Sequence, residues 1–316
     1  MVGGNKNMSK ENTAVTKKKI KRCKEDVVFD AACFIILTLV LFVVAYPLYW
    51  VIISSISAPS AVSSGKVLLH PIGFTLKGYA EVFKNDQVMR GFLNSLIITF
   101  CGVMVNLIVT LPTSYALSRS NFSGKKPITI FYLITMFFGG GLIPTYLVIQ
   151  RLQMLNTIWA LILPGCLSVY NMIVARTFFK SNISEELYEA AEIDGCTQAR
   201  FFFQIALPLS KAIIAILVLY YGVGHWNSYF SALVYISDKA KYPLQLVLRN
   251  ILITNQTALS QTATTAAARA ALQEKQQLID VMKYSLIIIS SIPVLVMFPL
   301  VQKHFVKGVM IGSMKG

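Results

Sequence analysis

Residues 189–208 read EAAEIDGCTQARFFFQIALP and lie in a polar segment between two long apolar stretches. Just before them, Ser184 is a favourable helix N-cap, and two glutamates follow it at the positive end of the helix dipole. Gly195 stands where a left-handed residue would end that helix. A second short helix is expected over 197–204, and Pro208 starts the chain back towards the next apolar stretch. Local chemistry therefore predicts a compact helix-turn-helix.

The first of these helices presents small side chains on one face. The residues at i, i+3, i+4 and i+7 of that face are Leu187, Ala190, Ala191 and Asp194. Because the two alanine side chains are small, another surface is able to approach the helix closely.

Composition places most of the remaining chain in a membrane. The chain has 316 residues, 55% hydrophobic and 14% charged, with a mean hydropathy of +0.61, whereas soluble domains carry about 25% charged residues. A helix needs roughly 20 apolar residues to cross a bilayer. Six windows without Asp, Glu, Lys or Arg meet this need: 31–65, 91–118, 127–150, 152–175, 212–237 and 284–302. A further window, 250–268, is rich in Asn, Thr, Gln and Ser and is rejected.

The predicted fold class is an all-α integral membrane protein with six transmembrane helices, because lipid-exposed backbone must satisfy its own hydrogen bonds. The spans are expected at about 28–54, 92–115, 128–149, 156–178, 212–235 and 284–302. The expected organisation is a basic tail (1–26), a first span with an outer segment (27–90), a core (91–302) and a C-terminal tail (303–316). The core contains a cytoplasmic loop, 179–210, and an outer loop, 236–282.

The net charge of +15 is distributed in a way that argues against nucleic-acid binding. Residues 1–26 hold eight Lys and Arg against three acids. Other basic residues flank the apolar windows: Arg119, Lys125, Lys126, Arg176, Lys180, Arg200, Lys211, Lys303 and Lys307. By the positive-inside rule both termini and the two loops 119–126 and 176–211 are cytoplasmic. The outer segments 66–90 and 238–283 also carry Lys and Arg, but they are longer, contain acids and weigh less in this rule.

The first span has one alternative interpretation, a cleaved signal peptide, since residues 58–61 include small side chains. Its apolar stretch is longer than the usual 7–15 residues, which favours a retained helix. None of the five cysteines lies in an expected outer loop and their spacing is not that of a metal site, so we expect buried apolar thiols.

The third span contains three consecutive glycines, Gly139 to Gly141, followed by Pro144. Each glycine costs roughly 1 kcal/mol in a helix interior, and proline removes a backbone hydrogen bond. A broken or closely packed helix is expected here, serving either helix packing through small residues or a hinge in a transport pathway.

The spacing E-A-A-x3-G-x9-I-x-L-P at 189–208 resembles, at every defined position, the cytoplasmic loop of ABC importer permeases. The resemblance implies a MetI-like permease fold in which residues 184–208, the coupling segment, dock in a cleft of a separate ATPase. Glu189 would then pair with a basic residue of the ATPase, the alanines would allow the close fit and Gly195 the turn. The coupling residues carried over are Glu189, Ala190, Ala191, Asp194, Gly195, Ile205, Leu207 and Pro208.

Three further stretches are similar to the carbohydrate-uptake branch of this family, specifically to the second permease of maltose-type importers and to importers of complex oligosaccharides. They are His225 to Phe230 (HWNSYF), 139–164 and the C-terminal KGVMIGSMKG at 307–316, so the resemblance covers roughly residues 90–316. It implies that this tail reaches into the ATPase dimer. It also implies that the 236–282 loop approaches the sugar on a binding protein.

The resemblance further implies a heterodimer with a second permease in a bacterial cell membrane, two copies of an ABC ATPase, an extracytoplasmic solute-binding protein and an oligosaccharide substrate. ATP and magnesium would be bound by the ATPase, with no cofactor in this chain. The sequence agrees, because it has no G-x-x-x-x-G-K-[ST] phosphate loop.

Other function classes fit less well. An ion-coupled carrier usually keeps Asp, Glu or His within the membrane, but the six windows hold no acid and only His225, which we expect to be packed and hydrogen-bonded. A membrane enzyme would need a nucleophile or metal motif, and a scaffold would not need the spaced loop.

Polar side chains in the spans are the candidates for a substrate pathway, because amides, hydroxyls and aromatic faces suit sugars. They are Asn94, Asn106, Thr110, Thr113, Asn171, Trp226 and Asn227. The alternative is hydrogen bonding between helices, a common use of such groups in membranes.

Overall fold

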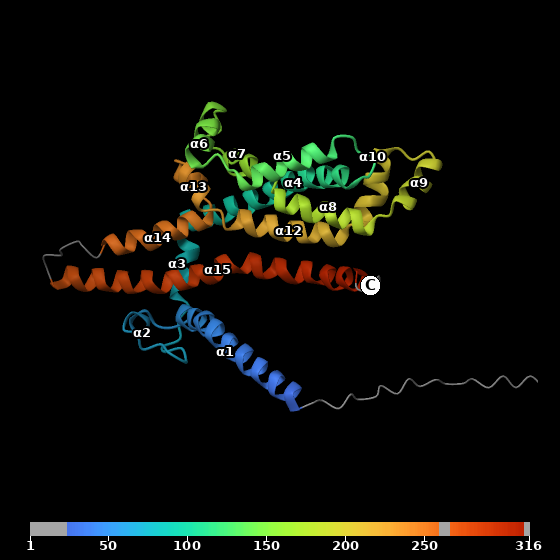
Figure 1. The fold of residues 1–316 in the computed structure, drawn as a ribbon. Coiled ribbons are helices and arrows are strands. Elements are labelled where there is room, and N and C mark those ends of the chain that lie inside the picture. The colour runs from blue at the N-terminus through green and yellow to red at the C-terminus, as the bar shows by residue number, and fades with distance from the viewer. Residues whose placement is uncertain (1–23, 259–265, 313–316) are drawn as a thin grey trace, which may run out of the picture. The chain divides into compact units, whose positions relative to one another are not determined.

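The computed structural model describes residues 24–258 and 266–312, where the chain forms helices joined by short connections and no strand (Figure 1). The chain divides into two units, Met1–Tyr49 and Trp50–Gly316. Parts of three expected segments lie outside the described residues: 1–23 of the basic tail, 259–265 of the outer loop and 313–316 of the C-terminal tail.

The first unit is described only as helix α1 (Lys24–Ser55), which continues into the start of the second unit. Glu25 and Asp26 lie in its first turn, where they complement the helix dipole, and the helix passes through Pro47 without ending. Its length and apolar composition suit a membrane span, in agreement with the window expected at 28–54.

The second unit contains the remaining helices. They are α2 (Pro59–Ser63), α3 (Lys77–Lys84), α4 (Asp86–Ser118), α5 (Lys125–Phe137), α6 (Leu142–Arg151), α7 (Trp159–Ile162), η1 (Leu163–Gly165), α8 (Val169–Asn182), α9 (Glu185–Ile193), α10 (Gln198–Phe201), η2 (Phe202–Ala206), α11 (Leu207–Leu209), α12 (Lys211–Trp226), α13 (Phe230–Tyr235), η3 (Lys239–Lys241), α14 (Leu244–Ala258) and α15 (Ala266–Gly312).

Among the described residues, three helical stretches are long and apolar enough to cross a membrane: Lys24–Ser55, Asp86–Ser118 and Gln276–Gln302. Three bent helix pairs pass the same test together, so the total is between three and six. The bends are 113° between α5 and α6, 52° between η1 and α8, and 80° between α11 and α12.

Helix α4 is the centre of the second unit, since it packs against α8, α12 and α14, while α12 also packs against α15. The close contact of α4 with α12 needs a glycine at position 102, because a Cβ there would lie 2.5 Å from the His225 ring nitrogen Nε2. Small residues at such crossings are typical of membrane helix packing.

The third span is broken at its glycines, as expected. Helix α5 ends at Phe137 and α6 begins at Leu142, and Gly141 adopts a φ of +84° that side chains rarely tolerate. A Cβ built on Gly139 or Gly141 would meet nothing within 4 Å in the described chain, so at Gly141 it is the positive φ that calls for glycine.

The structure differs from the sequence expectation at two other spans. A continuous helix was expected over 156–178, but the chain breaks between η1 and α8, where Pro164 and the N-cap Ser168 interrupt the backbone hydrogen bonds. The span expected at 212–235 also divides. Helix α12 ends at Trp226, and Asn227 caps it by donating from Nδ2 to the Val223 carbonyl at 3.0 Å.

The expected outer loop, 236–282, is helical over most of its described length. Helix α14 has apolar residues at helical spacing, and Leu244, Leu246 and Val247 are buried against neighbouring helices. A search for charge-free windows overlooks such an amphipathic helix. The following helix, α15, begins at Ala266, well before the span expected at 284–302.

Candidate functional site

The coupling segment folds as two helices joined by a tight turn. Helix α9 begins after Ser184, whose Oγ accepts a hydrogen bond from the Leu187 N–H at 3.3 Å. It ends at Ile193 with Asp194 as its C-cap, and Gly195 follows with a φ of +76° and donates from its N–H to the Glu192 carbonyl at 3.0 Å. The N-cap and the glycine stop therefore lie where the sequence predicts them.

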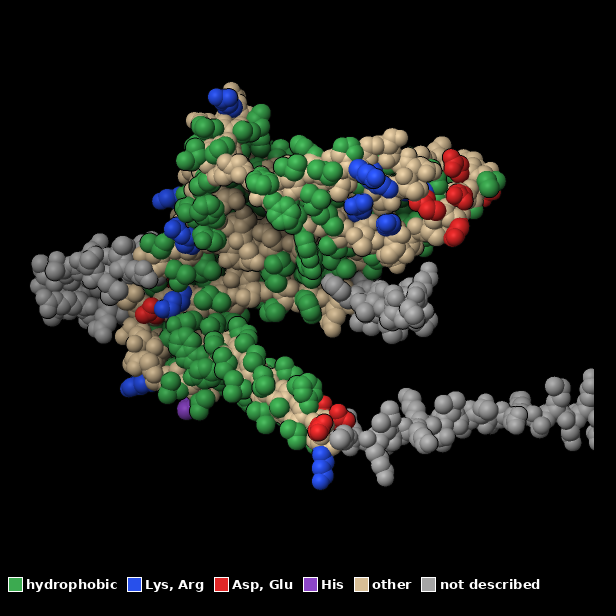
Figure 2. All heavy atoms as spheres, viewed as in Figure 1, with side chains coloured by type: hydrophobic (Ala, Val, Ile, Leu, Met, Phe, Trp, Pro, Cys, Tyr) green, Lys and Arg blue, Asp and Glu red, His purple; other side chains and the backbone are tan. Residues whose placement is uncertain are grey.

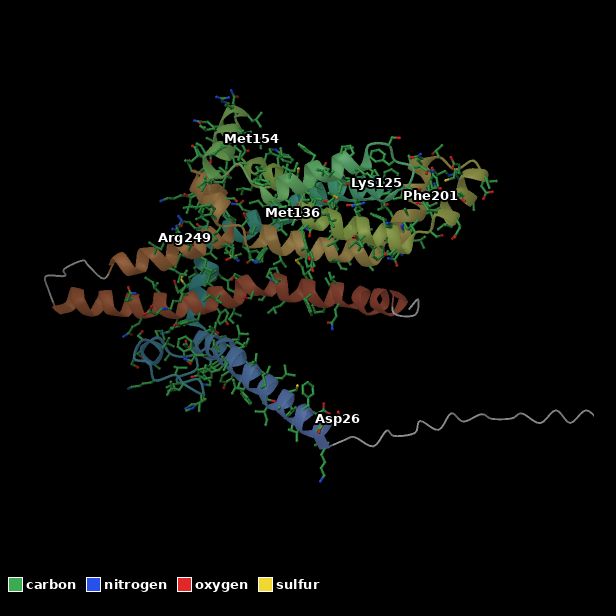
Figure 3. The ribbon with its side chains drawn as sticks, in the orientation of Figure 1. Asp26, Lys125, Met136, Met154, Phe201 and Arg249 are labelled. Atoms are coloured by element: carbon green, nitrogen blue, oxygen red, sulfur yellow. The ribbon has the colours of Figure 1, made fainter. Side chains whose placement is uncertain are left out.

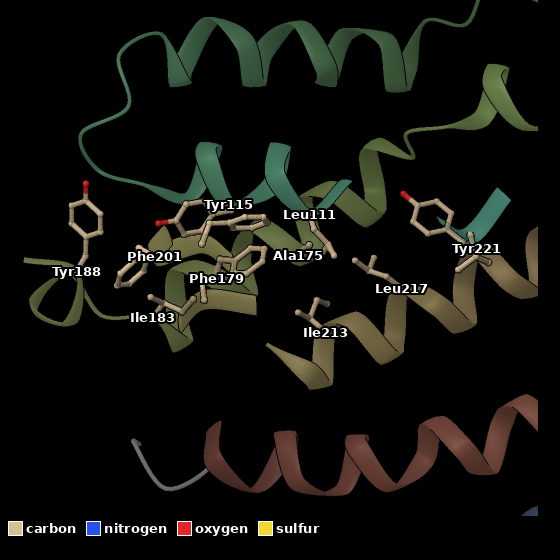
Figure 4. Close-up of a cluster of buried hydrophobic side chains, with 13 residues drawn as sticks. Leu111, Tyr115, Ala175, Phe179, Ile183, Tyr188, Phe201, Ile213, Leu217 and Tyr221 are labelled. Carbon is tan, nitrogen blue, oxygen red and sulfur yellow. The ribbon is translucent and has the colours of Figure 1, made fainter. Parts of the chain in front are cut away.

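The buried anchor of α9 is Tyr188, which sequence reasoning missed. Its side chain is 8% exposed, and its ring meets Phe201 edge to face with 5.2 Å between centroids. Phe201 in turn stacks near Tyr115 at the end of α4, and Tyr115 meets Phe179 of α8 at 5.7 Å. Figure 4 shows these aromatic rings converging between the helices. One core therefore joins α9 and α10 to α4 and α8.

Arg119, directly after α4, makes the polar part of this anchor. Its Nη2 lies 2.8 Å from Glu185 Oε2, and its guanidinium carbon lies 3.8 Å from the centroid of the Tyr188 ring. The Arg119 side chain is only 12% exposed, whereas its partner Glu185 is 46% exposed, so the ion pair lies at the edge of the buried ring contact. The Arg119 carbonyl accepts a hydrogen bond from Lys125 Nζ at 2.9 Å, at the first residue of α5.

The sequence carried a signal for this anchor. Glu185 and Tyr188 are spaced i and i+3, so they lie on one face of α9. In the sequence Glu185 indicates a helix N-terminus and Arg119 indicates membrane orientation, and neither signal predicts that the two residues pair.

The other face of α9 is exposed. Glu189, Ala190 and Asp194 are exposed to solvent, Ala191 is half-buried, and Ile193 is 87% exposed. Within the described part of the chain, Glu189 has no ion-pair partner. Figure 2 shows acidic side chains gathered at this end, with basic ones beside them.

The second half of the segment begins with a capped turn and buries three side chains, those of Phe201, Phe202 and Ala206. Thr197 Oγ1 accepts from the Arg200 N–H at 3.3 Å, and the chain continues through α10, a π-helical turn (η2) and α11. Phe201 and Phe202 are buried, whereas Phe203 is 64% exposed. Ile205 and Leu207 pack against the aromatic core, and Pro208 is exposed. Figure 3 labels Phe201 and Lys125 at this end of the unit.

Two of the candidate pathway residues take part in a buried polar network between α4 and α12. Asn106 Oδ1 lies 2.7 Å from His225 Nε2, and Asn106 Nδ2 donates to the Gly165 carbonyl at 2.7 Å. One turn further along α4, Thr110 Oγ1 lies 2.7 Å from Tyr221 Oη. Both Asn106 and Thr110 are fully buried. Here His225 has the packed, hydrogen-bonded role that the sequence favoured.

The pairing has a simple register, in which each helix contributes two residues one turn apart. Asn106 and Thr110 are spaced i and i+4 on α4, and Tyr221 and His225 are spaced i and i+4 on α12. Tyr221 Oη also accepts from the Ser168 N–H at 3.2 Å. The network therefore holds the break before α8 on both sides, through Gly165 and Ser168.

The other candidate pathway residues are dispersed. Asn94 donates from Nδ2 to the Ala240 carbonyl at 2.8 Å, and Thr113 donates to the Val109 carbonyl of its own helix at 2.7 Å. Trp226 is buried and donates from Nε1 to the Ser290 carbonyl at 2.9 Å. Asn171 is buried in the first turn of α8, and Asn227 is exposed at the end of α12.

The described residues contain no cluster of three or more His, Cys, Asp or Glu able to hold a metal ion. The four described cysteines are free and half-buried, and Cys23 lies outside the described residues.

Comparison with known proteins identifies the family. No family model matches the chain. The chain is 38% identical over 289 residues to "Protein LplC" of Bacillus subtilis (strain 168), covering 92% of this chain and 95% of that protein. It is 35% identical over 288 residues to the polygalacturonan/rhamnogalacturonan transport system permease protein YtcP of the same organism, covering 91% and 98%.

The fold comparison agrees. A chain from the crystal structure of a bacterial ABC transporter involved in the import of the acidic polysaccharide alginate superposes with a TM-score of 0.80 and 27% identity, covering 90% of this chain and 99% of that chain. Such permeases are transport components rather than enzymes. The chain therefore belongs to the family of membrane permease subunits of ABC importers for sugars and oligosaccharides.

Proposed function

We propose that this chain forms half of the translocation pathway of a binding-protein-dependent oligosaccharide importer and receives the work of ATP hydrolysis through the coupling segment, 184–208. The observation that carries the proposal is the two-sided character of α9. One side is fixed to the membrane helices by Arg119 and the Tyr188 ring, and the other side exposes Glu189, Ala190 and Asp194.

The fixed side packs α9 rigidly against the membrane helices. Tyr188, Phe201, Tyr115 and Phe179 form a continuous ring cluster that reaches α4 and α8, and Ile213 of α12 is buried in the same core. Packed interiors resist deformation. A displacement of α9 is therefore passed to three membrane helices instead of being absorbed by a flexible loop.

The free side is suited to a protein partner. The acidic side chains around the alanines offer ion pairs to basic groups, and the small side chains permit close approach. The exposed Ile193 adds apolar surface to the same end of α9. In this proposal Glu189 pairs with a basic residue of an ABC ATPase, which binds ATP and magnesium itself.

The proposed assembly is a heterodimer with a second permease, two ATPase copies and an extracytoplasmic solute-binding protein, in a bacterial cell membrane with both termini cytoplasmic. The basic residues beside the coupling segment support this orientation. The permease opens the pathway outward when the ATPases close on ATP and returns inward after hydrolysis. An oligosaccharide substrate is supported by the relatives, one named for polygalacturonan/rhamnogalacturonan transport and one for alginate import.

The test is binding-protein-stimulated ATPase activity in vesicles that contain the chain, its partner permease and the ATPase. Glu189→Gln is expected to lower stimulation several-fold while the membrane complex still assembles. The matched control is Glu81→Gln, which removes an acid paired with Lys84 near the opposite end of α4. Equal stimulation of ATPase activity in wild type and Glu189→Gln would show that Glu189 takes no part in the coupling contact. If the complete wild-type system shows no ATP-dependent uptake, the importer proposal itself is overturned.

A further inference from the structure

A cavity of about 570 Å³ lies at the end of α4 opposite the coupling segment. Ligand sites typically enclose about 300–1,000 Å³, so it is large enough for a sugar unit. Its walls come from the start of α4, from η3 and α14, and from α15. Its polar lining residues are Asn85, Gln87, Lys239, Tyr242, Arg249 and Asn250.

The charge in this cavity is positive. Lys239 and Arg249 line it, and no Asp or Glu is among its lining residues in the part of the chain that the structure describes. Two neighbouring acids are already engaged, since Asp280 lies 3.2 Å from Lys283 and Asp238 lies 3.9 Å from Lys241. Asp86, between the lining residues Asn85 and Gln87, is exposed and makes no ion pair with the described residues.

Lys241 provides an internal comparison for the two cavity cations. It donates to the Asn156 carbonyl at 2.9 Å in addition to its ion pair with Asp238, so it is a structural residue. Neither Lys239 Nζ nor the Arg249 guanidinium makes a hydrogen bond or ion pair with other described residues. Arg249 is half-buried on α14 (labelled in Figure 3), where a guanidinium without a partner among the described residues is costly.

The uncharged lining indicates what else a ligand would present. Val247 and Met282 are buried and form an apolar floor. The Asn85 side chain uses its oxygen to cap α4, accepting from the Gln87 N–H at 3.0 Å, which leaves its Nδ2 as a donor. An apolar floor, amide donors and an aromatic hydroxyl suit the C–H face and hydroxyls of a sugar ring.

The position of the cavity relates it to transport. Helix α4 has 33 residues, which is roughly 50 Å at about 1.5 Å per residue, against about 30 Å for the hydrocarbon core. If the coupling segment is cytoplasmic, the cavity therefore lies at the outer face, where substrate arrives.

We infer that this cavity binds an anionic sugar unit, a uronate, with Arg249 and Lys239 on its carboxylate. The inference rests on the proposed import function and specifies its substrate class. Arg249 supplies the planar fork that binds a carboxylate in bidentate fashion, and Lys239 supplies a second positive charge. The amide side chains bind ring hydroxyls.

The test compares trigalacturonic acid with its fully methyl-esterified form, which has the same rings without charge. Binding to the full-length chain in complex with its partner permease is measured by calorimetry in detergent. The wild-type complex is expected to bind the acid at least tenfold more tightly than the ester. Arg249→Gln with Lys239→Gln is expected to reduce that ratio below threefold by weakening binding of the acid alone.

The control is Lys66→Gln with Lys77→Gln, which removes two exposed positive charges outside the cavity and should preserve the ratio. If the double cavity variant does not assemble, the wild-type complex still decides the question, because added salt must weaken binding of the acid and leave the ester unchanged. Equal wild-type affinity for acid and ester, or no binding of either, overturns the inference.

Two other outcomes are informative. An unchanged ratio with weaker docking of the solute-binding protein would show that the two cations face a protein, which also overturns the inference. Import itself is scored separately, as stimulated ATPase activity and ATP-dependent uptake with the binding protein present. The binding measurement can therefore overturn the uronate site without affecting the importer proposal, and the transport measurement can overturn the importer proposal without affecting the binding result.

Discussion

His225 Nε2 on α12 lies 2.7 Å from Asn106 Oδ1 on α4, and the same amide donates from Nδ2 to the Gly165 carbonyl. Both polar ends of one fully buried side chain are therefore engaged, by different elements. Gly102, one turn before Asn106, leaves the space that the His225 ring occupies. Asn106 thus joins α4 and α12 to the break that precedes α8.

Replacement of Asn106 by leucine should destabilise the permease. The change leaves the Gly165 carbonyl and a His225 nitrogen without their partner, and such interhelical bonds are worth roughly 0.5–2 kcal/mol in membranes. The expected result is a lower melting temperature of the detergent-solubilised complex. Thr113→Val is the control, because Thr113 bonds only to its own helix. A loss of sugar binding in Asn106→Leu at unchanged stability would instead favour the pathway role.

Tyr221→Phe removes a single hydroxyl that lies 2.7 Å from Thr110 Oγ1 and accepts from the Ser168 N–H. We expect a loss of about 1 kcal/mol, measured as a shift in thermal or denaturant unfolding. Tyr220→Phe is a close match, since the neighbouring tyrosine is 47% exposed. Equal effects in the two variants would contradict a structural role for the Tyr221 hydroxyl.

Arg119→Gln should weaken coupling more than it weakens the fold. It removes the ion pair with Glu185 and the contact with the Tyr188 ring, the latter worth about 0.5–2 kcal/mol. Stimulated ATPase activity should fall, whereas Lys126→Gln, at an exposed basic residue nearby, should have no effect. A cycle that combines Arg119→Gln with Glu185→Gln measures the pair, and strictly additive losses would show that the two residues act independently.

Gly195→Ala tests the turn between the two coupling helices. A Cβ at Gly195 meets nothing within 4 Å, so the cost arises from its φ of +76° alone and should be about 1–2 kcal/mol. Gly165→Ala is the control, because that glycine also has open space but lacks the positive φ. Partial unfolding of 194–197, seen as faster hydrogen exchange, is expected only in Gly195→Ala.

The sequence predicted those parts of the protein whose signals are local. The N-cap Ser184, the stop at Gly195 and the break at Gly139 to Gly141 each depend on the chemistry of one residue or one short run, and each lies where it was expected. The long apolar windows likewise predicted helices. The break before α8 and the end of α12 at Trp226 were missed, because apolar composition does not mark an interruption.

Features that depend on contact between distant residues were not predicted. Arg119 and Glu185 are 66 positions apart, and the face of α9 that buries Tyr188 is decided by the position of Phe201. The pathway candidates illustrate the same limit. Composition marks Asn106 and Thr110 as polar groups in lipid, but only the packing of α4 on α12 shows that their side chains bond to other protein groups.

The hydrogen bond from Lys125 Nζ to the Arg119 carbonyl gives Arg119 a second connection, in addition to its side-chain contacts with α9. Its side chain joins α9, and its main chain joins both the end of α4 and the start of α5. Under the proposed function, a force on α9 would thus divide at Arg119 between α4 and α5, and α5 leads into the 113° bend. Under the proposed coupling function, such a branch point would pass one movement of α9 into two helices of different direction.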